Sequence, residues 1–116
     1  MQPVSLEEAA ALVQDGHTLA LGGFTVYRRP VAFALSLLQR NPRPQHLTLL
    51  NFTSSIESDL LVGAGCIETV RTCYFGLESF GLAPMFTQAV QTGAVKIIEE
   101  TEASIVNGIR AKLAGV

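Results

Sequence analysis

Two glycines and an aromatic residue, Gly22-Gly23-Phe24, follow a short apolar run near the start of the chain. Paired glycines at the carboxyl end of a strand let a ligand approach the backbone closely, because neither residue carries a Cβ. The N–H groups of Gly23 and Phe24 could then donate to a carbonyl oxygen, or to the oxyanion that acyl transfer creates. The same residues would also suit a tight turn that binds nothing, so the pattern alone leaves both interpretations open.

Arg28 and Arg29 come soon afterwards, immediately before Pro30. Their guanidinium groups could pair with a carboxylate or phosphate of a ligand, although solvated surface arginines are just as common. A helix is expected to begin at the proline, and cations near a helix N-terminus are unfavourable by roughly half a kcal/mol. An anion bound nearby would offset that cost.

Polar residues also follow the later apolar runs. Asn51, Thr53 and Ser54 supply an amide and two hydroxyls, which could recognise a carboxylate or thioester or could simply cap the next helix. Glu78 lies in the next such segment, at residues 76–79. We therefore count all four side chains among the candidate binding residues.

Three acids, Glu99, Glu100 and Glu102, stand close together, and Ser104 follows them. Ionised carboxylates this close would repel one another if partly buried, which would raise the pKa of at least one. Alternatively, acids placed before a helix simply stabilise its N-terminus. We favour that helix-stabilising role for Glu99 and Glu100, and we keep Glu102 and Ser104 as candidate site residues.

The elements that must position these residues alternate along the chain. Ser5 and Glu8 have the spacing of a capping box, which predicts a helix that ends at Asp15-Gly16. Strands are predicted at 18–21, 46–52, 68–75 and 95–99, and helices at 30–41, 59–62, 84–91 and 104–113. This alternation indicates right-handed βαβ units, and hence an α/β fold with a mainly parallel sheet flanked by helices. Ligands bind beyond the carboxyl ends of such strands, where residues 22–29, 51–55, 76–79 and 100–104 would lie.

Composition restricts the function classes. The chain has 116 residues, of which 48% are hydrophobic, and a formal net charge of −2 without a basic run, which argues against disorder and against a nucleic-acid partner. No apolar run approaches the ~20 residues that span a bilayer, and no signal peptide is evident, so we expect a cytoplasmic protein without a membrane partner. Cys66 and Cys73 lack metal-ligand spacing and are expected to be reduced packing thiols, so no metal site is predicted.

The whole chain also resembles a known family. Asp15-Gly16, the apolar run 19–21, Gly22-Gly23-Phe24 and Pro30 resemble the first glycine motif of the A (alpha) subunit of family I coenzyme A transferases. Arg28 stands where that family most often has glycine. In this respect the sequence resembles two branches of the family, the glutaconate CoA-transferase-like subunits and the CoA-ester ring hydrolases of steroid breakdown. The likeness continues in order through residues 60–65, 74–78, 99–104 and 110–116.

This resemblance implies a CoA-transferase-like fold and a function. An A subunit would act with a B (beta) subunit to move coenzyme A between an acyl-CoA thioester and a carboxylic acid, with the thioester as substrate and no tightly bound cofactor. In the family, the B subunit supplies the nucleophilic glutamate from a Ser-Glu-Asn-Gly motif, and nothing in residues 1–116 matches that motif. The position of Glu102 keeps a glutamate in the glutaconate-like and ring-hydrolase branches, which implies a place in the active site.

Two alternatives stay open. The chain could belong to a ring-opening C–C hydrolase of CoA esters, in which Glu102 acts as a general acid/base with water, or it could be a non-catalytic half that binds CoA or a partner chain. Subunits of the family are longer than this sequence. We therefore expect residues 1–116 to form the N-terminal part of an A subunit, either truncated or a split gene product, that is inactive without its partner.

Overall fold

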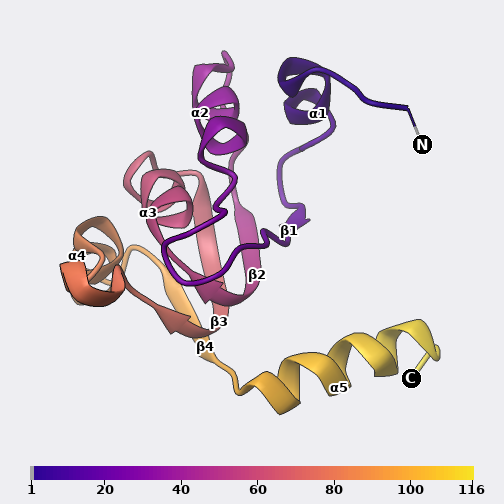
Figure 1. The fold of residues 1–116 in the computed structure, drawn as a ribbon, viewed down its shortest axis with the longest axis vertical. Coiled ribbons are helices and arrows are strands. Elements are labelled where there is room, and N and C mark those ends of the chain that lie inside the picture. The colour runs from indigo at the N-terminus through magenta and orange to yellow at the C-terminus, as the bar shows by residue number, and fades with distance from the viewer. Residues whose placement is uncertain (1) are drawn as a thin grey trace.

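The computed structural model describes residues 2–116 and has the α/β fold that the sequence predicts. Its four-stranded sheet is parallel throughout, in the order β1 (Thr18–Leu19), β2 (Leu47–Ser54), β3 (Ile67–Phe75) and β4 (Lys96–Glu99). Strands that follow one another in the sequence are thus neighbours in the sheet (Figure 1). With right-handed crossovers, this order places the connecting helices on one face.

Helices cover the two faces of the sheet unequally. α1 (Leu6–Ala11), α2 (Val31–Gln39), α3 (Ile56–Gly63) and α4 (Pro84–Gln91) pack against one another in that order. α5 (Glu102–Leu113) follows β4 and runs away from the other helices, with a cavity between it and the sheet (Figure 1). No helix in residues 2–116 combines the length and the apolar character needed to cross a bilayer.

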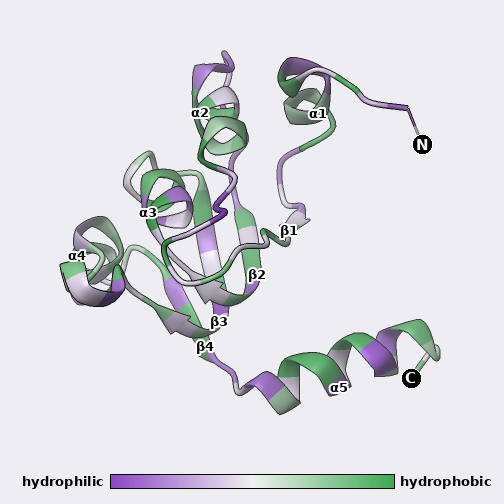
Figure 2. Cartoon of the chain, in the orientation of Figure 1, coloured by the Kyte–Doolittle hydropathy of each residue, from purple (hydrophilic) through white to green (hydrophobic). Residues whose placement is uncertain are grey.

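The core lies between the sheet and the packed helices. Leu49 of β2 and Val70 of β3 are register partners and are fully buried there, together with Leu37 of α2 and Leu61 of α3. Strands of a parallel sheet normally have apolar cover on both faces. Figure 2 shows hydrophobic residues along α5 as well, yet Leu113 on that helix is 84% exposed.

Several helix ends follow local signals in the sequence. The predicted capping box is present, because Ser5 Oγ accepts from the amide of Glu8 (3.1 Å) and the Glu8 carboxylate accepts from the amide of Ser5 (2.8 Å). α4 has the predicted bounds and begins at Pro84. α1 is shorter than predicted and ends at Ala11, whereas α5 begins at residue 102 rather than 104 because Thr101 caps it. α3 begins at residue 56 rather than 59.

One buried hydrogen bond explains why β1 is shorter than predicted. The N–H of Leu21 donates to Oδ1 of Asn51 (2.7 Å), so a side chain takes the place of strand pairing and β1 stops at Leu19. β2 continues to Ser54. Thr53 and Ser54 therefore lie in the strand and not in the loop beyond the predicted strand, whereas Asn51 lies in the strand as predicted.

Candidate functional site

The candidate site residues gather where the parallel strands end. The segment 20–30 follows β1, Ser55 follows β2, a short 3-10 helix (Glu78–Phe80) lies just beyond β3, and Glu100 follows β4. Because the strands are parallel, these segments share one edge of the sheet. Three of these four segments contain a residue that the sequence analysis discussed, and the exception is Ser55.

The loop after β1 is closed on itself and presents three side chains outward. The amide of Phe24 donates to the carbonyl of Tyr27 (2.9 Å), and the amide of Tyr27 donates back to Phe24 (2.7 Å). Thr25 and Arg28 have φ angles of 50° and 54°, in a region that non-glycine residues rarely adopt. Phe24, Tyr27 and Arg28 are exposed and line a shallow hollow at the tip of the loop. Since the Phe24 N–H is already engaged, it is not the free oxyanion donor that we expected, and Gly23 is left as the candidate.

Arg29, unlike the exposed Arg28, has its side chain buried in the protein. Its side chain is only 2% exposed, and its Nε donates to the carbonyl of Thr25 (2.6 Å). Nη1 and Nη2 donate to the carbonyl and hydroxyl oxygens of Thr53 at 2.9 and 2.7 Å, and Nη1 lies 3.6 Å from Oε1 of the fully buried Glu57. The guanidinium therefore joins the loop to the end of β2 and to α3.

The two glycines have different surroundings. A Cβ on Gly23 would lie 2.5 Å from Cδ of Arg29, and Gly23 has a φ of +144°. A Cβ on Gly22 would meet nothing within 4 Å. In this structure the group that closely approaches Gly23 is Arg29, whereas the space beside Gly22 is open.

A buried polar network continues from this loop through β2. The side-chain amide of Asn51, which is 2% exposed, donates to Ser54 Oγ (3.0 Å) and to Ser58 Oγ (3.2 Å). Ser58 Oγ in turn donates to Oε1 of Glu57 (2.9 Å). The structure thus brings Arg29, Thr53, Asn51 and Ser54 together, and it adds Glu57 and Ser58, which the sequence analysis did not single out.

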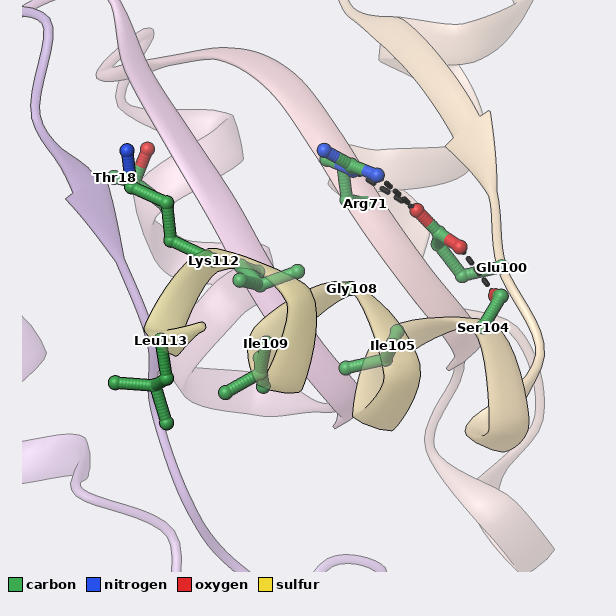
Figure 3. A pocket seen from close by; sticks show the side chains of 10 residues that line it. Thr18, Arg71, Glu100, Ser104, Ile105, Gly108, Ile109, Lys112 and Leu113 are labelled. Atoms are coloured by element: carbon green, nitrogen blue, oxygen red, sulfur yellow. Dashed lines mark hydrogen bonds and ion pairs between the residues drawn. The ribbon is translucent and has the colours of Figure 1, made fainter. Parts of the chain in front are cut away.

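A second polar cluster ties α5 to the sheet (Figure 3). Nε of Arg71 donates to Oε1 of Glu100 (3.0 Å), Nη2 of Arg71 also contacts this oxygen, and Ser104 Oγ donates to Oε2. The Glu100 side chain is 8% exposed. The hydrogen bonds from Ser104 and Arg71 lower the pKa of Glu100, and they outweigh the opposing effect of burial. The mutual repulsion that we considered for the three acids thus does not raise the pKa of Glu100.

Glu102 is the first residue of α5 and is exposed. Burial raises the pKa of the Cys73 thiol on β3, and the negative charges of Glu102 and then Glu100 raise this pKa further. Burial also raises the pKa of Cys66, against a smaller opposing effect of Arg43. Both thiols are free and are disfavoured as thiolates. No group of three metal-ligating side chains is found in residues 2–116.

Between α5 and the sheet lies a cavity of about 510 Å³ (Figure 3). Leu50, Ile105, Ile109 and Leu113 supply apolar lining, and the Arg71 cluster is at one end. Glu100 and Ser104 of that cluster also line the cavity.

Glu78, the remaining candidate, is exposed in the short helix after β3. Its backbone amide is engaged, because it donates to Tyr74 Oη (3.2 Å). Its φ of 54° is another left-handed value at a non-glycine residue. The side-chain carboxylate of Glu78 is exposed, so it remains a candidate for ligand binding, whereas its backbone amide does not.

Comparison with known proteins identifies similar sequences. Residues 4–115 match the family model described as coenzyme A transferase. The chain is 31% identical over 117 residues to the A subunit of the 3-oxoadipate CoA-transferase of Pseudomonas knackmussii, covering 97% of this chain and 40% of the relative. It is 28% identical over 115 residues to the cholesterol ring-cleaving hydrolase IpdA subunit of Rhodococcus jostii, covering 96% and 37%.

Solved structures with the same fold agree with these matches. The glutaconate coenzyme A-transferase of Acidaminococcus fermentans superposes with a TM-score of 0.82 at 27% identity, over 97% of this chain and 36% of that one. A variant of the decarboxylase AibA/AibB superposes with a TM-score of 0.85 at 28% identity, over 97% and 44%. The chain thus spans less than half the length of each of these relatives and structures.

Proposed function

This chain belongs to the coenzyme A transferase family and is similar to its A subunits, and from that premise we propose that it is the N-terminal part of such a subunit. In this proposal, the carboxyl edge of the sheet binds an acyl-CoA thioester and a carboxylic acid, between which coenzyme A is transferred. A B subunit completes the site in a hetero-oligomer. The observation that carries the proposal is the loop after β1, which combines open space at Gly22 with an outward Arg28.

The roles of the loop residues follow from their surroundings. Gly22 has open space where a ligand could lie against the backbone, and the Gly23 amide is the candidate donor to the thioester carbonyl or its oxyanion. Arg28 is exposed and is assigned to a substrate carboxylate or a CoA phosphate. Phe24 lies beside Arg28 in the same hollow and offers an apolar surface for the ligand.

Glu102 is assigned to the reacting part of the site. It is an exposed carboxylate at the carboxyl edge, and it could orient the substrate or carry a proton. The nucleophilic glutamate would come from the B subunit, because residues 1–116 hold no Ser-Glu-Asn-Gly motif. Four of the candidate residues would hold the site in place without contacting the ligand, because their side chains are hydrogen-bonded within the protein: Asn51, Thr53, Ser54 and Ser104.

Two other functions are kept as alternatives. Similarity to a subunit named as a ring-cleaving hydrolase, together with the exposure of Glu102, favours a C–C hydrolase in which Glu102 activates water. The second alternative is a non-catalytic half that binds CoA or a partner chain. The transferase and the hydrolase differ in whether a covalent glutamyl-CoA adduct forms.

The test is to trap that adduct. The chain is incubated with acyl-CoA, alone and with a B-subunit candidate carrying a Ser-Glu-Asn-Gly motif. Borohydride then reduces any glutamyl-CoA thioester to the side-chain alcohol and releases CoA, and both chains are weighed for the small loss of mass that records the adduct. We expect no stoichiometric adduct on any glutamate of this chain, and one on the partner. An adduct on this chain would overturn the division between subunits. Turnover of a ring-containing CoA ester without any adduct would favour the hydrolase.

A further inference from the structure

We propose that Arg29 is a positioning residue, whose buried side chain, held by Glu57 and Thr53, fixes the ligand-binding conformation of the loop after β1. We call Arg29, Thr53 and Glu57 the loop clamp. The structural part of this inference rests on contacts within the chain, and its consequence for ligand binding rests on the proposed function. The two arginines that are adjacent in the sequence would then have separate tasks, with Arg28 meeting the ligand.

The contacts show why the clamp controls the loop. Nε of Arg29 returns to the carbonyl of Thr25 within the loop, while both terminal nitrogens reach Thr53 at the end of β2. Nη1 also faces Glu57 on α3. One side chain therefore connects the turn of the loop to two elements of the folded core. Elsewhere in the segment, Phe24 and Tyr27 are paired with each other, and the amide of Leu21 near the start of the loop donates to Asn51.

Charge burial makes this connection hard to break. The side chains of Arg29 and Glu57 are 2% and 0% exposed, and Oε2 of Glu57 has no hydrogen-bond partner among residues 2–116. Losing either partner would leave the other charge buried without compensation, which is strongly unfavourable. Movement of Arg29 out of the core is opposed for the same reason.

Backbone strain shows that the loop needs such a constraint. Thr25 and Arg28 hold left-handed φ angles, which persist in non-glycine residues only when the surrounding structure fixes them. Both residues lie close to Arg29 in the sequence. Without the clamp, relaxation of these two residues would turn Arg28 away from its present direction and disturb the backbone at Gly23.

The first experiment measures loop opening without any ligand. Amide hydrogen exchange of Phe24 and Tyr27 is followed in the 116-residue chain and in the variants Arg29→Lys and Glu57→Gln. Arg40→Lys is the matched control, because the partly buried Arg40 also donates hydrogen bonds to backbone carbonyls, but those carbonyls belong to Ala10 and Val13, far from the loop in sequence.

We expect exchange at Phe24 and Tyr27 to accelerate at least about tenfold in both clamp variants, relative to the core amide of Leu49, and to stay unchanged in Arg40→Lys. Thr53→Val, which removes a single hydrogen bond, should give a smaller increase. Unchanged exchange at the loop, or an equal acceleration of all amides in every variant, would overturn the clamp.

The second experiment separates positioning from direct contact. Coenzyme A is titrated into each chain at several salt concentrations, since an exposed ion pair weakens as salt rises whereas a buried one is screened much less. Arg28→Ala should lower both the affinity and its dependence on salt. Arg29→Lys should lower the affinity at least about threefold but keep the salt dependence of the unaltered chain.

The outcomes remain distinguishable. A reduced salt dependence in Arg29→Lys would mean that Arg29 contacts the anion directly, and unchanged affinity despite faster loop exchange would mean that the loop does not position a ligand. Either result overturns the positioning role. If the unaltered chain does not bind coenzyme A, the proposed function is what fails for this chain, and the exchange data still decide whether Arg29 fixes the loop.

Discussion

Glu100, the first residue after β4, accepts two hydrogen bonds from Arg71 of β3 on a single carboxylate oxygen. Its other oxygen accepts from Ser104 in the first turn of α5. The carboxylate therefore links the sheet to the helix that begins at Glu102. This is a more specific role than the general stabilisation of a helix N-terminus that the sequence suggested for Glu100.

We expect Glu100→Gln to loosen the start of α5 while the core stays folded. The neutral amide loses the charge-assisted bonds to Arg71, which are about twice as strong as neutral ones. Amide exchange at Ser104 and Ile105 should accelerate relative to Leu49. Glu99→Gln is the control, because Glu99 is an exposed acid next in the chain. Equal exchange in both variants would contradict the link.

The same carboxylate predicts a pH dependence. Hydrogen bonds from Ser104 and Arg71 hold the pKa of Glu100 below its ordinary value of 4.5. A lowered folded-state pKa contributes stability that is present above the ordinary value and lost as the pH falls through the folded-state value. Backbone resonances at the start of α5 should therefore shift below pH 4.5, before the core unfolds. The transition should be missing in Glu100→Gln, and its persistence there would assign it to another group.

The two glycines of the loop give a matched pair for stability. Gly23→Ala places a Cβ against Arg29 and strains a positive φ, so we expect a loss of roughly 1–3 kcal/mol in the free energy of unfolding. Gly22→Ala meets open space and should stay within about 0.5 kcal/mol. Urea denaturation measures both. Equal effects would mean that Arg29 does not occupy the space beside Gly23 in solution.

Local signals in the sequence were sufficient for much of the fold. The capping box at Ser5, the bounds of α4 and the parallel arrangement of strands all followed from short-range patterns. The polar network did not, because its members are far apart in sequence: Asn51 satisfies the amide of Leu21, and Arg29 neutralises Glu57. A buried glutamate looks like any surface acid until its partner is known.

The same limit applied to the candidate site. Glycines followed by adjacent arginines correctly marked a loop at the carboxyl edge, but no local pattern distinguishes Arg28, which is exposed, from Arg29, which is buried. Likewise, three neighbouring acids could not reveal that Glu100 is paired with Arg71, a residue on another strand. Pairing between distant elements decides which polar side chains remain free for chemistry.

The thiol of Cys73 can report on the position of Glu102. Burial raises the pKa of Cys73, and the carboxylates of Glu102 and Glu100 raise it further. We expect Glu102→Gln to lower this pKa, which would be seen as faster iodoacetamide labelling of Cys73 near pH ~8, where thiols begin to ionise. Labelling of Cys66, resolved by peptide mass spectrometry, is the internal control. An unchanged rate at Cys73 would place the Glu102 carboxylate away from this strand.

Activity of Glu102→Gln distinguishes the proposed functions of the assembled enzyme. If Glu102 transfers a proton, as in the hydrolase alternative, kcat should fall roughly a hundredfold or more, because a glutamine cannot act as acid or base. If it only orients the substrate of a transferase, the loss should be modest and appear partly in KM. Because the proposed function places half of the site on a B subunit, the assay uses the complex of both chains.

Glu99→Gln is the control for this measurement, since Glu99 is exposed on β4 and has no assigned role in the reaction. Glu100→Gln is unsuitable, because loosening the link to Arg71 would also move Glu102. A small and equal effect at Glu99 and Glu102 would mean that Glu102 serves only the N-terminus of α5. The chemistry would then have to come from the partner subunit, with this chain contributing the loop at Gly22 and Arg28.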